Sequence, residues 1–392
     1  MLSTNRDRAA ALLIDQGPLY RADMARLLGV SRTTVTNVVN TLLEAGTIEP
    51  EHRRGAGPAP VGEPAALKER LVIARRTGVL ATVAHLPEKT LVALAALDGD
   101  LITLRSRNCA ITAGGQDRMN TAVELLGELL NEGTVVGIPL RALHLAVNTQ
   151  CDADTGAVLG DEASALWRGI NPKQWMQDTF GVEVALQNTA RLLGLAQHRS
   201  DAGTGARNLI YVHLAHGISM GHVLDGQIAG GSHGGAGELG HVSIDREGRP
   251  CACANRGCLM QYVGLAAIED QVCAVLGPGS TVQDAVQAAL AGSHACASII
   301  AQAGTILGEA LTTVCNLLDP DTIVLGGTLA QAGDALLDPI RQEVHRRALP
   351  LVTRKLRVSS AAVLSDQAIA DAGIHAIGQD PELVDSIVQT LH

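Results

Sequence analysis

One histidine and three cysteines lie close together in the segment 237–261. They are His241, Cys251, Cys253 and Cys258. Nine residues separate the histidine from the first cysteine, one separates the first two cysteines, and four separate the second from the third. Three thiolates and an imidazole form the ligand set of a closed, tetrahedral structural Zn²⁺ site, with no open position for a catalytic water. The sequence therefore predicts a structural zinc ion. The alternative is a group of buried free thiols beside an unrelated histidine.

The compartment in which the chain works bears on this prediction. The amino-terminal sequence MLSTNRDRAAALLIDQ has no apolar leader segment, and no later run reaches the roughly 18 apolar residues needed to cross a bilayer. We expect a cytoplasmic protein with no membrane contact. Cysteines stay reduced in the cytoplasm, which favours a metal site over a disulfide. The other five of the eight cysteines stand alone, and we expect them to be small core residues.

Aromatic residues are scarce, since the 392 residues include one Phe, two Trp and three Tyr. The cores must therefore be filled by Ala, Leu, Val and Ile, and binding of single-stranded nucleic acid by stacked aromatic side chains is disfavoured. At roughly 100–200 residues per domain, the length predicts two or three domains.

Charge is unevenly distributed along the chain, whose 30 basic and 40 acidic residues give a net charge of −10. Residues 1–76 hold eleven Lys/Arg and eight Asp/Glu, a local charge of +3, which leaves 19 basic and 32 acidic residues, or −13, for the remainder. A basic head before an acidic body fits a head that contacts phosphate. An excess of three charges is equally consistent with chance.

The first 75 residues contain the pattern of a winged helix-turn-helix. Helices are predicted over 5–16, 21–29 and 32–45, with Gly29 in the turn before the third helix and Ser31 as its N-cap. The third helix has one apolar stripe with helical spacing, formed by Val35, Val38, Val39, Leu42 and Leu43. After Gly46, two predicted strands flank a Gly/Pro-rich tip, which is the pattern of a wing.

The polar face of the third helix is suited to the major groove of double-stranded DNA, because short hydroxyl and amide side chains can read base edges and arginine can reach guanine or phosphate. The alternatives are that this polar face is an ordinary solvated helix surface and that the two arginines of the wing are an incidental run of charge. The residues predicted to contact DNA are Arg32, Thr33, Thr36, Asn37 and Asn40 on the helix, with Arg53 and Arg54 in the wing.

From Thr77 onward the pattern changes to alternating strands and helices. Two stretches share a hairpin with the sequence LDG at its turn, at Asp98-Gly99 and at Asp225-Gly226, and each is followed by helical segments and a further buried strand. A duplicated unit of this kind predicts two α/β lobes that face a cleft, as in actin-like and sugar-kinase folds. Two unrelated hairpins are the competing explanation.

Several motifs together resemble the ROK family of sugar kinases and sugar-responsive transcriptional regulators. These motifs are SRTTVTNVVNTLLEAG at 31–46, GAGELGH at 235–241 followed by the three cysteines, NLLDPDTIVLGG at 316–327 and AIADAGIHAI at 368–377. The resemblance implies an α/β fold in which a winged helix-turn-helix precedes a two-lobed, sugar-kinase-like body. It also implies a zinc ion on His241, Cys251, Cys253 and Cys258, and a sugar in the cleft. The expected domains are residues 1–75, a first lobe at 76–189 completed by about 370–392, and a second lobe at 190–369 that carries the zinc loop.

The chain departs from the kinase members of this family at the positions that carry phosphoryl transfer. Thr189 stands where those kinases have the Asp that acts as base, and a threonine hydroxyl has no useful basicity near neutral pH. The first phosphate loop is replaced by AHLPEKT at 84–90 and the second by AHG at 215–217, while the GGT at 326–328 is as easily a structural turn. We therefore expect no catalysis. A kinase would need a substitute base, for which Asp201 and Asp225 are the nearest candidates.

The sugar site matches the family only in part. Asn188, Glu238 and His241 match positions that hydrogen-bond a hexose, whereas Met260 replaces a glutamate. Because two acceptors are lost, we expect an effector other than a plain hexose; the alternative is that the cleft no longer binds a ligand. The wing also departs from the family's Gly-Arg-Pro, since this chain has Gly62-Glu63-Pro64.

These observations predict a cytoplasmic, zinc-stabilised transcriptional regulator, a homodimer or higher homo-oligomer, that represses by binding a palindromic DNA operator. Its body would sense a sugar or sugar derivative. Two other functions stay open: an active sugar kinase with an attached DNA-binding module, and a regulator that needs no effector.

Overall fold

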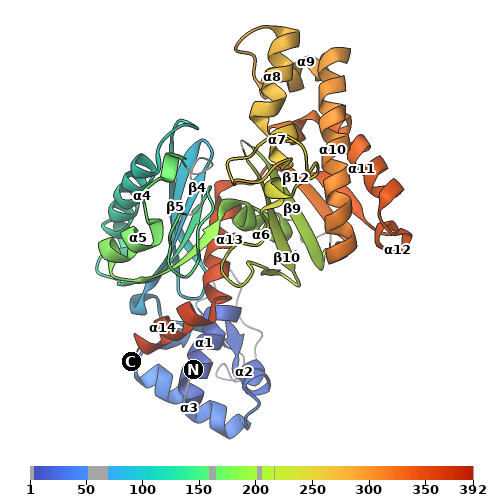
Figure 1. Cartoon of the computed structure of the whole chain (residues 1–392). Helices are drawn as coiled ribbons and strands as arrows, with labels where there is room; N and C mark the ends of the chain where they lie inside the picture. The colour runs from blue at the N-terminus through green and yellow to red at the C-terminus, as the bar shows by residue number, and fades with distance from the viewer. Residues whose placement is uncertain (1–3, 52–68, 159–164, 201–204, 216, 392) are drawn as a thin grey trace. The chain divides into compact units, whose positions relative to one another are not determined.

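The computed structural model describes residues 4–51, 69–158, 165–200, 205–215 and 217–391 (Figure 1). The predicted wing tip with Arg53, Arg54 and Glu63 lies outside these residues, as does Asp201. The chain divides into two compact units. Unit 1 comprises Met1–Ala146, Asn171–Leu186 and Ala370–His392, and unit 2 comprises Val147–Ile170 and Gln187–Ile369.

Unit 1 begins with the predicted helix-turn-helix. Its helices are α1 (Asn5–Gln16), α2 (Arg21–Leu28) and α3 (Arg32–Glu44), and its small antiparallel sheet has the order β1 (Leu19–Tyr20), β3 (Arg70–Ile73), β2 (Ile48–Pro50). Gly29 ends α2 in the left-handed region with φ 69°, which a glycine adopts without strain. The Ser31 side chain accepts from the backbone N–H of Thr34 and so caps α3, as predicted. Strands β2 and β3 pair as the two sides of a wing.

The larger sheet of unit 1 has the order β6, β5, β4, β7, β8. Their bounds are β6 (Leu101–Asn108), β5 (Lys89–Ala96), β4 (Val79–Leu86), β7 (Leu140–Val147) and β8 (Glu183–Asn188). Strands β4 to β6 are antiparallel, whereas β7 pairs with β4 in parallel. Helices α4 (Gly115–Leu130) and α5 (Pro172–Phe180) also belong to this unit.

The carboxyl-terminal helices connect this sheet to the DNA-binding head. Helix α13 (Asp366–Gly378) is followed by α14 (Pro381–Gln389), which lies beside α1 (Figure 1). Leu13 and Ile14 of α1 share one hydrophobic core with Ile387 and Val388 of α14, and Leu80 of β4 lies in the same core. The head is therefore packed against the body of unit 1 through its own hydrophobic core.

Unit 2 repeats the strand arrangement of unit 1, which confirms the duplicated α/β architecture. Its sheet has the order β11 (Gln227–Ile228), β10 (Ile218–Leu224), β9 (Asn208–Leu214), β12 (Thr322–Gly327), β13 (Arg357–Ser360). The hairpin from β9 to β11 is antiparallel, and β12 is parallel to both of its neighbours. The predicted turn at Asp225-Gly226 has φ 50° and 82°, as a type I′ turn requires.

The following helices of unit 2 form one hydrophobic core with this sheet: α7 (Met260–Val263), α8 (Leu265–Leu276), α9 (Val282–Leu290), α10 (His294–Leu318), α11 (Asp334–Arg347) and α12 (Pro350–Thr353). Helix α6 (Thr189–Ser200) contacts β9 and β10 and contributes no residue to that core. Among the described residues, α10 alone is long and apolar enough to cross a membrane, but half of that window is buried inside the fold. Burial of this kind is typical of a core helix.

Candidate functional site

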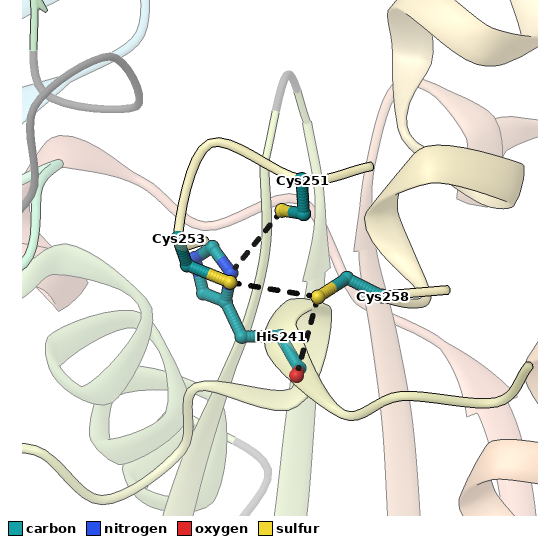
Figure 2. A group of neighbouring side chains, drawn as sticks. All are labelled: His241, Cys251, Cys253 and Cys258. Atoms are coloured by element: carbon teal, nitrogen blue, oxygen red, sulfur yellow. Dashed lines mark hydrogen bonds between the residues drawn. The ribbon is translucent and has the colours of Figure 1, made fainter. Parts of the chain in front are cut away.

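The four predicted metal ligands lie together in unit 2 (Figure 2). One nitrogen of His241 and the sulfur atoms of the three cysteines all lie within 4.8 Å of one another. The sulfur of Cys251 is 3.7 Å from Nδ1 of His241, and the sulfur atoms of Cys253 and Cys258 are 3.6 Å apart. This cluster of one imidazole and three thiols could hold a metal ion.

The loop that carries the cysteines is held by its own backbone. Ser243 bridges to Cys258, and Pro250 bridges to Arg256, so that both sides of the loop are paired. Gly257 has φ 66°, and a Cβ atom there would lie 1.6 Å from the carbonyl oxygen of Asp245. Only glycine fits this position, and it places Cys258, which is fully buried, opposite His241.

The thiols differ in their readiness to ionise. Burial raises the pKa of Cys251, but hydrogen bonds from the Cys253 backbone and from the side chains of Gln261, Cys258 and Cys253 outweigh it and lower that pKa to about 6. Burial and the neighbouring thiols raise the pKa of Cys258 to about 12. The pKa shifts of Cys251 and Cys258 are opposite in direction, and a bound cation would favour the thiolate form of each.

Glu238 lies three residues before His241, at the end of a loop held by a buried arginine. Arg191 of α6 is 2% exposed. It donates from Nε to the carbonyl of Ala236 at 3.0 Å, and from Nη2 to the carbonyls of Ala236 and Gly234. Burial raises the pKa of Glu238, and the interactions with Arg191 and His241 offset only part of that rise. Glu238 is thus a half-buried carboxyl group at the end of a loop that Arg191 holds.

Asn188 stands at the start of α6. Its Oδ1 accepts from the backbone N–H of Ala190 at 2.8 Å, and its amide donates to the carbonyl of Thr149 at 3.3 Å. The next residue, Thr189, is buried at the first position of the helix. Arg191 of α6 therefore connects Asn188 and Glu238. It lies one turn after Asn188 and binds the loop that precedes Glu238.

All five predicted DNA contacts on α3 are exposed; they are Arg32, Thr33, Thr36, Asn37 and Asn40. The opposite face packs in the core through Val35, Val39 and Leu42, as the apolar stripe predicted. Thr36 donates its hydroxyl back to the carbonyl of Arg32, and Asn40 accepts from Arg21 of α2 at 3.3 Å. The polar groups of the other three side chains make no hydrogen bond to a described residue; these are Arg32, Thr33 and Asn37.

The segment 84–90, which the sequence predicts to replace a phosphate loop, forms a tight hairpin. Leu86 of β4 pairs with Lys89 of β5, so two residues make the turn. Arg118 of α4, which is 1% exposed, donates to the carbonyls of Leu86 at 2.7 Å and Pro87 at 2.8 Å. In unit 2, a Cβ on Gly326 would lie 2.0 Å from the hydroxyl of Tyr211, so this side chain fills the space beside the GGT turn.

Sequence reasoning missed both buried arginines. The carbonyls that Arg191 binds lie 43 and 45 residues further along the chain, and the strand carbonyl that Arg118 binds lies 32 residues before it. No local pattern marks either of them. The sequence offers one hint that Arg191 is buried: it lies among the apolar residues of TARLLGLA.

Comparison with known proteins places this geometry in a family. The ROK family matches residues 91–376 of the chain. A glucokinase of Halalkalibacterium halodurans is 31% identical over 264 residues, which cover 64% of this chain and 78% of that protein. The DNA-binding transcriptional repressor Mlc of Escherichia coli is 25% identical over 378 residues, which cover 92% of this chain and 90% of that repressor.

Solved structures give the same fold. A ROK family transcriptional regulator, a homologue of the E. coli Mlc protein, has a TM-score of 0.74 at 24% identity and covers 99% of this chain and 98% of its own. A ROK family glucokinase from Streptomyces griseus, in complex with glucose and AMPPNP, has a TM-score of 0.60 at 21% identity and covers 76% and 98%. The chain belongs to the ROK family, and the predicted fold, a winged helix-turn-helix before a sugar-kinase-like body, is confirmed.

Proposed function

We propose that this protein is a DNA-binding transcriptional repressor of the ROK family whose body senses a sugar or sugar derivative. The observation that carries the proposal is the pairing, in one chain, of an α3 helix with an exposed polar face and a ROK body in which the kinase positions are replaced. Arg32, Thr33 and Asn37 offer donors and acceptors of the kind that read base edges. Repressors named Mlc and xylose repressor match most of this chain.

The body acts as a sensor and not as an enzyme. Phosphoryl transfer to a sugar hydroxyl needs a base, and Thr189 supplies none at the position where ROK kinases carry Asp. It also needs loops whose backbone N–H groups surround phosphate. The two-residue turn between β4 and β5, fixed by Arg118, offers no such loop.

The His241, Cys251, Cys253 and Cys258 cluster holds a structural zinc ion. With Zn–S bonds of about 2.3 Å, neighbouring ligand atoms of a tetrahedral site lie about 3.8 Å apart. The 3.6 Å between two sulfur atoms and the 3.7 Å between sulfur and imidazole fit that spacing. Bound zinc would hold the loop closed, and with four protein ligands it takes no part in chemistry.

The effector binds at Asn188, Glu238 and His241, whose polar groups suit hydroxyl donors and acceptors. The working form is a cytoplasmic homodimer or higher homo-oligomer on a palindromic operator, because two-fold symmetric dimers read inverted half-sites. The wing arginines Arg53 and Arg54 would supply phosphate contacts.

The test is DNase footprinting of the full chain on the DNA upstream of its own gene and of the neighbouring genes. We expect a protected palindrome with half-sites about one helical turn apart. Uniform binding to random and genomic fragments would contradict the proposal.

A sugar kinase is the second candidate, favoured by the 31% identity to a glucokinase. Incubation with ATP, Mg²⁺ and a panel of sugars tests it. We expect no sugar-dependent release of ADP, whereas turnover above the rate without sugar would make the protein an enzyme.

A further inference from the structure

The exposed face of α3 carries two asparagines one turn apart, Asn37 and Asn40, whose side-chain amides differ in their hydrogen bonds. Oδ1 of Asn40 accepts from Nη1 of Arg21 at 3.3 Å. The side-chain amide of Asn37 makes no hydrogen bond to a described residue. The two residues therefore carry the same side chain but offer different groups to a base pair.

The partner of Asn40 determines which way its amide is turned. A guanidinium has five N–H donors and no acceptor, so only the oxygen of an amide can bond to it. With Oδ1 of Asn40 turned towards Arg21, Nδ2 of the same amide is turned away from it and donates to no described residue. Asn40 is thus presented as a hydrogen-bond donor, whereas Asn37 can offer both a donor and an acceptor.

Arg21 is the first residue of α2 and is half-buried. Its bond to Asn40 uses only Nη1, and it forms no ion pair with a residue in the described part of the chain. Arg26 on the same helix differs, because it donates to Asp23 at 2.9 Å. The remaining N–H groups of Arg21 are open to a backbone phosphate, so this arginine can bind phosphate and hold Asn40 at the same time.

The base edges of the major groove distinguish the two amide presentations. Adenine offers the acceptor N7 beside the donor N6, so an asparagine pairs with it through both its oxygen and its NH₂ group. Guanine offers two acceptors, N7 and O6, and cytosine offers only a donor. An amide whose oxygen is already bonded cannot form the bidentate pair with adenine, but its NH₂ group can still donate to guanine.

We propose that Arg21 determines the base specificity of Asn40: by holding Oδ1, it makes this residue select guanine over adenine. The inference rests on the proposed function, because it requires α3 to lie in the major groove of an operator. Arg21 is a positioning residue and reads no base itself. Loss of Arg21 frees both groups of the Asn40 amide, which then suits adenine.

The experiment is the selection of binding sites by the full-length protein from a library of random-sequence duplexes, followed by sequencing. The base pair that Asn40 contacts is the one at which Asn40→Ala removes the preference of wild type. We expect wild type to favour guanine over adenine there by at least about fivefold. Arg21→Met should reverse this preference to adenine, and Arg21→Lys should keep guanine because its ammonium group still donates to Oδ1.

Arg26→Met is the matched control and should leave every base preference unchanged, since Arg26 bonds to Asp23 of its own helix. Loss of a phosphate contact lowers affinity for all sequences alike, so a change at one base pair separates the positioning of Asn40 from a general contribution to binding. Asn40→Asp is a second test that leaves Arg21 in place. Its carboxylate keeps the bond to Arg21 and presents an acceptor, so the preference should move to cytosine.

Four results overturn the inference: a folded Arg21→Met that keeps the guanine preference, an Asn40→Asp that keeps it, an Asn40→Ala that changes no preference, or a wild type that prefers another base at the Asn40 position. Each of them leaves the repressor function untouched, because wild type still selects a sequence. A wild type that enriches no sequence contradicts the inference together with the proposed function.

Discussion

The sulfur of Cys251 lies 3.7 Å from Nδ1 of His241, although the second residue comes ten positions before the first in the chain. His241 follows Glu238 by three residues, and the backbone N–H of His241 donates to the carbonyl of Glu238 at 3.0 Å. The backbone that follows Glu238 is therefore held by the metal cluster, and the backbone that precedes it is held by Arg191 through Ala236.

We predict that the purified protein carries about one Zn²⁺ per chain and that Cys253→Ser lowers the melting temperature by about 5 °C or more. Cys253 is exposed, so without a metal this substitution would cost little. Cys273→Ser is the control, because Cys273 lies outside the cluster and serine keeps its hydrogen bond to the carbonyl of Ser280. Metal analysis without stoichiometric zinc, or equal melting temperatures for the two variants, would contradict the zinc site.

Gly257→Ala should open the metal loop. A Cβ at this position meets the carbonyl of Asp245, and the left-handed φ is strained for alanine, so we expect a loss of more than about 2 kcal/mol and of bound zinc. Gly99→Ala is the matched control, since Gly99 has φ 87° but open space around it, and it should cost only about 1 kcal/mol. If urea unfolding shows the same loss of unfolding free energy for Gly257→Ala and Gly99→Ala, the contact with Asp245 does not matter.

The sequence predicted those parts of the molecule that depend on local pattern. The three head helices, the cap at Ser31 and the type I′ turn at Asp225-Gly226 follow from residue types a few positions apart. The His/Cys cluster was also predictable, because its spacing is short and cysteines are scarce elsewhere.

The contacts that fix the candidate site were not predictable from local pattern. Arg191 and Arg118 look like ordinary helix charges, and only the folded chain brings each to carbonyls more than 30 residues away. The packing of α14 on α1 joins the two ends of the chain, which no periodicity reveals. The amphipathic pattern of α14 predicts a buried face, but it does not say what covers that face.

Asn37→Ala should weaken binding to the operator more than binding to random DNA. Its exposed amide on α3 can pair with a base edge, and such contacts give specificity whereas phosphate contacts give general affinity. The expected loss on the operator is about 1–3 kcal/mol. Asn131→Ala, which removes an exposed amide at the end of α4, serves as control and should bind both DNAs normally. Equal losses on operator and random DNA would mean that Asn37 reads no base.

Acid should destabilise the fold through buried imidazoles. Burial lowers the pKa of His144 from 6.5 to about 4, and neither of its ring nitrogens has a hydrogen-bond partner among the described residues. The unfolded chain then binds a proton at higher pH than the folded chain, so this stability is full above pH 6.5 and is lost as pH falls towards 4. Each unit of pKa difference contributes about 1.4 kcal/mol.

The measurement is urea unfolding at pH 7.5 and pH 5.5. His144→Leu should lose less stability between the two values than wild type, because it has no imidazole to protonate. His345→Leu, at an exposed position on α11, should behave like wild type. An identical pH dependence in all three proteins would contradict the role of His144.

The most direct test is the operator affinity of wild type and Glu238→Ala, measured with and without the carbohydrate that stabilises the wild type in a thermal-shift screen. We predict that this effector changes the operator affinity of wild type by about tenfold or more, which requires about 1.4 kcal/mol of preference between two states. Glu238→Ala should bind the operator as tightly as effector-free wild type and should no longer respond. A folded Glu238→Ala that loses operator binding, or that still responds fully to the effector, would contradict the account.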